Sequence, residues 1–177
     1  MELELLSPAQ CFGYASFVVG VTAFLQKSDR RFKWLNSSQS LVSAVHFLLL
    51  GNLPASASSL LSCVRSYLAL KPRSPLVPAV IVLANIAAGF AFVKSGLGWL
   101  PIVATCAGTV AIFTTQGIPL RLVLLCCTSL WLANNIISGS IGGVALELVI
   151  ALINTATIVR MFRSLPREPL QPAEEVL

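Results

Sequence analysis

Three ionisable side chains with a capacity for chemistry lie inside apolar stretches of this sequence: Glu147, His46 and Arg65. An ionisable group near the centre of a bilayer costs about 2.5–3.5 kcal/mol, so each needs a partner, a proton or water. Glu147 and His46 are predicted at one depth, roughly 10 Å from the outer ends of their helices. At one level, a carboxyl group and an imidazole could exchange a proton during a transport cycle. Arg65 lies deeper and could pair with Glu147 as a structural lock, contact an anionic substrate or extend toward the cytoplasm.

Uncharged polar residues accompany these groups at helical spacing. Gly143, Glu147 and Asn154 are separated by four and seven residues, so they occupy one stripe of a helix. The alternative to a binding role is that Ser, Asn and His side chains only join neighbouring membrane helices, with energies of about 0.6–2 kcal/mol. The predicted substrate-binding set carries hydroxyl, amide, imidazole and indole groups: His46, Ser59, Ser62, Ser66, Trp131, Asn134, Asn135 and Asn154.

Composition places these residues in a membrane protein. Hydrophobic residues make up 56% of the 177 residues and charged residues 11%, whereas soluble domains average about 25% charged residues. The five cysteines have no CxxC spacing and no histidine partners, so we expect free thiols and no metal site. The sequence has no nucleophile elbow, phosphate loop or nucleotide fingerprint, which predicts that the protein is not an enzyme and has no cofactor.

Breaks at charged residues, glycine and proline divide the chain into seven apolar segments. A bilayer core about 30 Å thick requires roughly 17 to 25 mostly apolar residues per helix. The predicted fold class is therefore all-α, an integral membrane protein with seven transmembrane helices. The expected spans are residues 8–26, 38–53, 54–71, 75–93, 99–115, 120–138 and 140–163.

Positive charges are segregated to alternate loops. The positive-inside rule then predicts an N-terminus outside and a C-terminus in the cytoplasm. The net charge of +5 fits anionic lipids at the cytoplasmic loops better than nucleic acid, which would need a clustered basic face. The loops that follow the odd-numbered spans carry these charges: Lys27, Arg30, Arg31, Lys33, Lys71, Arg73, Arg121, Arg160, Arg163 and Arg167.

The chain contains an internal repeat at an offset of 88 residues, which matches Gly20 with Gly108 and Gly51 with Gly139. The offset relates the first three spans to the last three. Because three is odd, the fourth span must reverse direction for the two halves to run parallel, and parallel repeats usually form the substrate path between them. The predicted domains are a three-helix bundle (8–71), a linker helix (75–93), a second three-helix bundle (99–163) and a disordered cytoplasmic tail (164–177).

Two resemblances follow from this layout and its motifs. Two three-helix bundles joined by one helix resemble the SWEET and PQ-loop transporter superfamily. Over about residues 13–163 the chain more closely resembles the YgjV family of bacterial inner-membrane proteins. The strings that carry this second resemblance are Ser28-Asp29-Arg30-Arg31-Phe32-Lys33, Val45-His46-Phe47-Leu48-Leu49-Leu50-Gly51 and Gly139-Ser140-Ile141-Gly142-Gly143.

The resemblances carry different implications. The YgjV resemblance implies a location in the bacterial inner membrane. The SWEET resemblance implies a sugar contact at Asn154, with Ser62 or Ser66 as its counterpart in the first half. The chain departs from the SWEET pattern, since it has no Pro-Gln pair and its prolines stand at the expected helix ends.

These observations predict a transporter that carries a small polar metabolite, sugar-like or another small organic solute, between the two bundles, by uniport or with proton coupling. The first alternative is an accessory or sensory membrane protein that binds a partner through its cytoplasmic basic loop, and the second is a channel. A polar cavity lined by His46, Trp131, Glu147 and Asn154 would support a carrier. A dry axis would favour the accessory protein, and a continuous wet pore a channel. The sequence leaves the solute and a homo-oligomeric state open.

Overall fold

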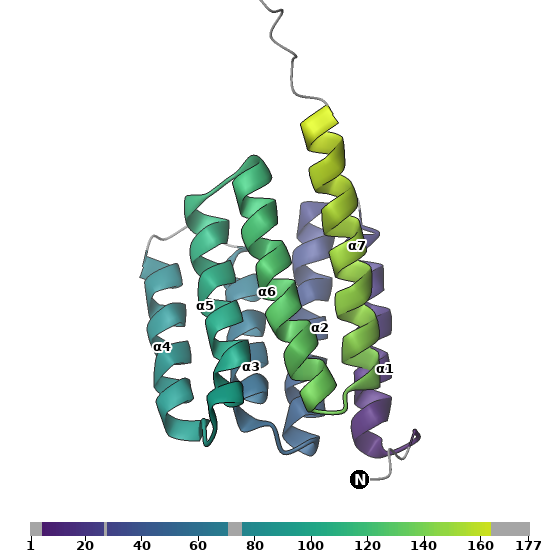
Figure 1. The fold of residues 1–177 in the computed structure, drawn as a ribbon, viewed down its shortest axis with the longest axis vertical. Coiled ribbons are helices and arrows are strands. Elements are labelled where there is room, and N and C mark those ends of the chain that lie inside the picture. The colour runs from purple at the N-terminus through teal and green to yellow at the C-terminus, as the bar shows by residue number, and fades with distance from the viewer. Residues whose placement is uncertain (1–4, 27, 71–75, 164–177) are drawn as a thin grey trace, which may run out of the picture.

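A computed structural model describes residues 5–26, 28–70 and 76–163 of the chain. Over these residues the protein is all-α, as predicted, with seven α-helices and one short 3-10 helix (Figure 1). The helices are α1 Pro8–Phe24, α2 Asp29–Leu49, α3 Leu53–Leu68, α4 Leu76–Phe92, η1 Gly96–Gly98, α5 Trp99–Thr114, α6 Gly117–Ile137 and α7 Ile141–Arg163. The tail predicted over 164–177 lies outside the described residues.

The second helix is longer than the sequence predicts. The expected span began at residue 38, with Arg30, Arg31 and Lys33 in a loop, but α2 begins at Asp29. Hydropathy locates the part of a helix that contacts lipid, whereas backbone hydrogen bonding continues a helix into polar sequence. Because α2 begins at Asp29, Asn36 and Gln39 both lie in the interior of the helix.

Two tight turns, Leu50–Asn52 and Ser138–Ser140, connect α2 to α3 and α6 to α7. Gly51 and Gly139 have φ angles of 74° and 67°, a left-handed conformation that glycine adopts without a steric penalty. The backbone N–H of the residue after each glycine reaches back five positions, from Asn52 to Phe47 O and from Ser140 to Asn135 O, each at 2.9 Å. This pattern ends a helix and turns the chain.

The 88-residue offset is visible in the helix bounds. It superposes both ends of α2 (Asp29–Leu49) on those of α6 (Gly117–Ile137) and the start of α3 on the start of α7. Short connections make successive helices antiparallel, so α1, α3, α5 and α7 run one way and α2, α4 and α6 the other (Figure 1).

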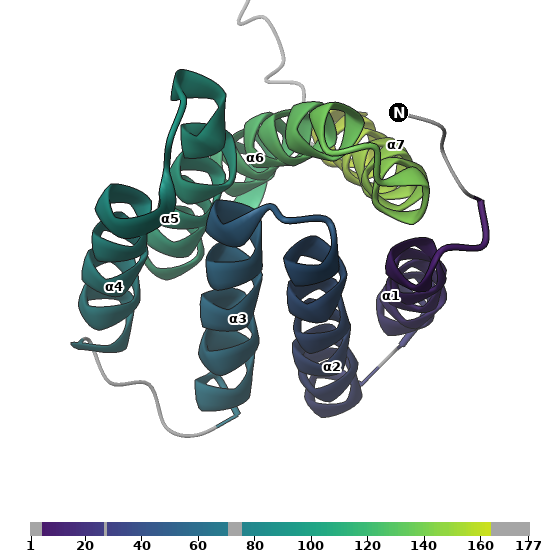
Figure 2. The same cartoon turned by 90° about the horizontal axis from the view of Figure 1, so that it is seen from below.

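Six of the helices form a closed ring, seen end-on in Figure 2. In each half the helices pack in chain order, α1 on α2 on α3 and α5 on α6 on α7. The ring closes because α3 packs on α5 and α7 packs on α1. The repeat relates these two contacts to each other, since it matches α1 with α5 and α3 with α7. Helix α4 stands outside the ring against α3 and α5. It is held by buried Asn85, which accepts from Ser58 Oγ at 2.9 Å and donates to Ile102 O at 2.9 Å.

The distribution of polarity is the reverse of that in a soluble protein. Large apolar side chains are exposed on all seven α-helices, for example Val18, Leu83 and Leu152. The buried set is rich in Ser, Thr, Asn and Gln, and its apolar members are mostly alanine and isoleucine. By length and apolarity, Gly96–Thr114, α6 and α7 are able to cross a membrane, and α4 is a shorter apolar helix. An apolar exterior around a polar interior fits a membrane protein with an internal solvent-accessible site.

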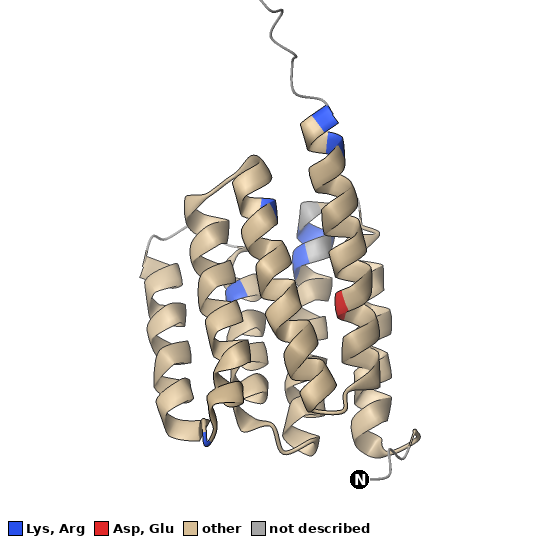
Figure 3. Ribbon diagram, in the orientation of Figure 1, with Lys and Arg blue, Asp and Glu red and all other residues tan. Residues whose placement is uncertain are grey.

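Charge distinguishes the two ends of the ring (Figure 3). The end with the two tight turns is called the hairpin end. The opposite end holds the starts of α2 and α6 and the end of α7 and is called the basic end, because Lys33, Arg121, Arg160 and Arg163 lie on those helix segments.

Candidate functional site

A cavity of about 770 Å³ lies inside the ring. All six ring helices contribute side chains to it, and α4 contributes none. Its wall carries serine, threonine and amide groups together with Glu147 and Arg65. A volume in this range accommodates a small organic molecule.

The two ends of the cavity differ in access. At the basic end its lining includes Thr114 and Gln116, which are exposed at the turn between α5 and α6. At the hairpin end its lining includes His46, Phe47 and Asn135, whose exposed fractions are 2%, 4% and 2%. The cavity therefore reaches the surface at the basic end and is closed at the hairpin end.

Two hydrogen-bonded pairs close the hairpin end, and the repeat relates them. Asn52 Nδ2 donates to Asn134 Oδ1 at 3.0 Å, and His46 Nε2 lies 2.7 Å from Ser140 Oγ. The offset of 88 residues carries His46 onto Asn134 and Asn52 onto Ser140. Each pair thus joins the second helix of one half to the residue that precedes the third helix of the other. We call these four residues the seal.

Further contacts between the halves reinforce the seal. Gln10 Nε2 donates to Gly139 O at 2.6 Å, and Gln10 Oε1 accepts from the backbone N–H of Ile141 at 3.2 Å. Gly142 lies against the backbone of Gly13 so closely that an added Cβ would overlap the Gly13 carbonyl. The hairpin end is therefore closed by packing as well as by hydrogen bonds.

His46 belongs to the seal through both ring nitrogens. Nδ1 lies 2.6 Å from Ala9 O, and since a carbonyl only accepts, Nδ1 carries a proton. In the neutral ring Nε2 then accepts from the hydroxyl of Ser140. Gly13 packs on the ring, because its added Cβ would lie 2.9 Å from His46 Cε1. The predicted proton exchange with Glu147 would have to break one of these bonds.

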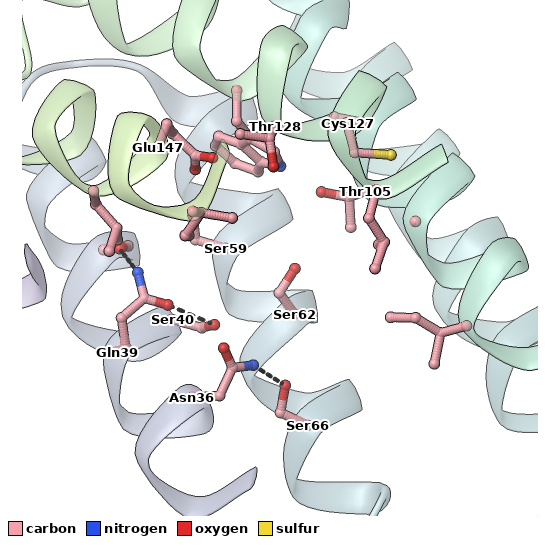
Figure 4. A pocket seen from close by; sticks show the side chains of 18 of the residues that line it. Asn36, Gln39, Ser40, Ser59, Ser62, Ser66, Thr105, Cys127, Thr128 and Glu147 are labelled. Atoms are coloured by element: carbon pink, nitrogen blue, oxygen red, sulfur yellow. Dashed lines mark hydrogen bonds between the residues drawn. The ribbon is translucent and has the colours of Figure 1, made fainter. Parts of the chain in front are cut away.

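Glu147 faces the cavity without a protein partner. Among the described residues no hydrogen bond or ion pair reaches its carboxylate, and Figure 4 shows it on the cavity wall near Ser59 and Thr128. Arg65 Nη1 donates to Thr109 Oγ1 at 2.8 Å and forms no ion pair with Glu147. Within the described residues, therefore, the structural lock between these two residues is not formed.

The cavity brings together most residues of the predicted site. His46, Ser59, Ser62, Ser66, Trp131, Asn135, Asn154, Glu147 and Arg65 all line it. Asn134 does not line it and belongs to the seal. Asn154 is held by Arg121, since its Nδ2 donates to Arg121 O at 3.0 Å and its Oδ1 accepts from Arg121 Nη1 at 3.4 Å.

Further polar residues of the wall were missed from the sequence, and five of them are Asn36, Gln39, Ser40, Thr105 and Thr128. Asn36 was placed outside the second span, and Gln39 and Ser40 at its edge, because that span was started too late. The repeat offset was the available signal for Thr128, since it pairs this residue with Ser40. Figure 4 shows all five on the cavity wall, with Asn36 bonded to Ser66 at 2.8 Å.

Comparison with known proteins identifies the family. A family model described as bacterial inner membrane protein, Imp-YgjV, matches residues 7–164. The chain belongs to this family. It is 36% identical over 155 residues to the inner membrane protein YgjV of Escherichia coli strain K12, covering 88% of this chain and 85% of that relative. The predicted YgjV resemblance and the inner-membrane location are thereby confirmed.

No solved structure matches the chain. The likeness to SWEET transporters therefore stays a prediction.

Proposed function

We propose that this protein is a carrier that moves a small polar solute across the bacterial inner membrane through the cavity inside the ring. One observation supports the proposal above the others. A polar cavity, lined by His46, Trp131, Glu147 and Asn154, reaches the surface at one end and is closed at the other by contacts between two repeat-related halves. A carrier needs a site that is accessible from one side at a time, and parallel repeats provide it between the halves.

The positive-inside rule orients the carrier. The basic end then faces the cytoplasm and the hairpin end the periplasm, with the N-terminus outside. The state described is open to the cytoplasm, and the seal acts as the periplasmic gate. In the opposite state the seal opens and the basic end closes, so each seal bond contributes to the balance between the two states.

Accessibility of a cavity residue tests this proposal. Ser62→Cys is placed in a chain without its five natural cysteines, and inverted and right-side-out vesicles are treated with a membrane-impermeant maleimide. We expect faster labelling in inverted vesicles, which expose the cytoplasmic face. The control is Leu83→Cys on the exposed face of α4, which should resist the reagent in both preparations. Equal labelling of Ser62→Cys from both sides would favour a channel. No labelling of Ser62→Cys from either side would favour an accessory protein. Either result would overturn the proposal that the protein is a carrier.

Transport itself is measured in liposomes. Purified protein is screened against small polar solutes by thermal shift, and each stabilising solute is tested for uptake. We expect uptake above that of protein-free liposomes for at least one stabilising solute. Stabilising solutes that never enter the liposomes would contradict a transport function even if the cavity is accessible.

A further inference from the structure

Four side-chain amides of the cavity wall donate hydrogen bonds to protein acceptors. Asn135 Nδ2 donates to Trp131 O at 2.9 Å, and Asn154 Nδ2 donates to Arg121 O. Because each of these acceptors is a carbonyl, the orientation of both amides is determined. Gln39 Nε2 donates to two serine hydroxyls at 2.9 and 3.0 Å, and Asn36 Nδ2 to Ser66 Oγ. Each of these four side-chain amides therefore donates at least one hydrogen bond to the protein.

Three oxygen-bearing groups on the same wall have no hydrogen-bond partner in the described part of the protein. Asn135 Oδ1 and Thr105 Oγ1 are buried and have no hydrogen-bond partner, although the residues are only 2% and 3% exposed. The carboxylate of Glu147 also has no partner among the described residues. Buried polar atoms are usually hydrogen-bonded. Asn135 Oδ1 and a carboxylate only accept hydrogen bonds, so these two groups indicate a ligand that donates, whereas the Thr105 hydroxyl can accept or donate.

These acceptors lie at the closed end of the cavity. Ser59, Thr105, Trp131 and Glu147 each stand six residues from the hairpin end of their helix, roughly 9 Å along its axis. We call these four residues the floor layer. Asn135 is nearer the same end, and its Oδ1 lies beside Gly143, one helical turn before Glu147. The floor layer thus combines a carboxylate, two hydroxyl groups and an indole ring.

We propose that the floor layer binds a protonated amino group, so that the substrate of the proposed carrier is a small amine or an amino-bearing zwitterion. An ammonium group supplies three donors and a positive charge, which match the unpaired Asn135 Oδ1 and the carboxylate of Glu147. The indole of Trp131 adds a surface that attracts cations. This inference rests on the proposed function only in calling the bound molecule a substrate.

The cationic residues of the wall lie away from the floor layer. Arg65 is twelve residues from the start of α3, roughly 9 Å further toward the basic end, and it donates to Thr109. Arg121 is bonded to Asn154, and Lys33 lies near the start of α2. Charge along the cavity is therefore acidic at the floor and basic toward the mouth. A bound amino group is stabilised most at the floor layer, far from the cationic side chains.

Binding is measured on the full-length protein in detergent by isothermal titration and thermal shift. The probes are ethanolamine and 1,4-diaminobutane as amines, 4-aminobutanoate as a zwitterion, glycerol and glucose as neutral polyols, and butanoate as an anion. We expect at least one amino compound to bind and the polyols and butanoate not to bind. Glu147→Gln should weaken amine affinity about 10- to 100-fold, as expected for losing a charged hydrogen bond, and Trp131→Leu about 3- to 30-fold.

A matched control separates binding from folding. Ser129→Ala removes an exposed hydroxyl of α6 that bonds only to its own helix, so amine affinity should stay unchanged. Thr105→Val keeps the shape of the floor layer and should weaken binding even if Glu147→Gln fails to fold. Binding of a polyol or of butanoate without any amino compound would overturn the amine inference and leave the carrier intact. Amine binding that Glu147→Gln and Thr105→Val leave unchanged would also overturn it. Amine binding lost in both variants, without uptake in liposomes, would support the binding site and contradict the carrier.

Discussion

Asn52 offers the sharpest test of the seal because its side chain has two separable roles. Oδ1 accepts from the backbone N–H of Ala55 at 3.1 Å and caps α3. Nδ2 donates to Asn134 Oδ1 at 3.0 Å and to Ser138 Oγ at 2.7 Å, both in the other half. Asn52→Ser keeps a capping oxygen but is too short for the bonds between halves, whereas Asn52→Ala removes both.

The expected losses follow from these contacts. Hydrogen bonds between membrane helices contribute about 0.6–1.7 kcal/mol each in double-mutant cycles, so losing the two bonds to the other half in Asn52→Ser should lower the free energy of unfolding by about 1–3 kcal/mol. The Nδ2 atom of Asn134 is already unpaired, so after the substitution neither amide atom of that residue has a partner. Loss of the cap adds about 1 kcal/mol in Asn52→Ala.

The assay combines stability with accessibility. Free energies of unfolding are measured in mixed micelles with increasing denaturing detergent. Labelling of Ser62→Cys is followed from the periplasmic face. If the seal is the gate, the loss of about 1–3 kcal/mol applies only to the state in which the seal is formed. The fraction of molecules open to the periplasm, and hence the labelling rate from that face, then rises by about 5- to 150-fold.

Ser56→Ala is the matched control for Asn52→Ser. Its hydroxyl donates to Ala44 O at 2.8 Å within one half, so the substitution should cost one hydrogen bond of stability without changing periplasmic labelling. Equal labelling rates for the parent protein and Asn52→Ser, despite a measured loss of stability, would refute the role of the seal as a gate. Unchanged stability in Asn52→Ser would refute the energetic argument itself.

Three other predictions follow from single contacts. Gly13→Ala should lower the free energy of unfolding by about 1–3 kcal/mol, because its Cβ would overlap His46, which two hydrogen bonds hold in place. The control Gly96→Ala should be neutral, since no atom lies within 4 Å of the added Cβ. Equal effects of the two substitutions would contradict the packing argument. Asn85→Ala should cost about 1–3 kcal/mol in the same measurement, since it removes the hydrogen bonds from α4 to Ser58 and Ile102, and a neutral result would show that these bonds do not hold α4 in place. Glu147→Gln should abolish uptake or its dependence on a pH gradient in liposomes, and unchanged transport would exclude proton coupling through this residue.

Local features of the fold were predictable from the sequence. Gly51 and Gly139 marked both tight turns, because glycine is the residue that tolerates their left-handed backbone. Apolar stretches located the helices, with one failure at the start of α2. This error affected the predicted site, since it removed Asn36 from the candidate residues and placed Gln39 at the edge of its predicted span.

The partners of the polar residues were not predictable. His46 and Glu147 were expected to interact because they were predicted at one depth. In the structure His46 is three residues from the hairpin end of α2 and bonds to Ala9 and Ser140, whereas Glu147 is six residues from that end of α7 and faces the cavity. Depth specifies the position along a helix axis, but the direction of a side chain around that axis depends on the neighbours that pack against it.

By itself, the sequence determined that the protein is an all-α membrane protein, where most of its helices end and that its two halves repeat at 88 residues. These properties depend on hydropathy, glycine conformation and composition, which act locally along the chain. Only the tertiary structure decided that Asn52 bonds to Asn134 and His46 to Ser140, and that Glu147 is left unpaired in a cavity open at the basic end. Those contacts join residues more than 80 positions apart, so they exist only once the ring of six helices has closed.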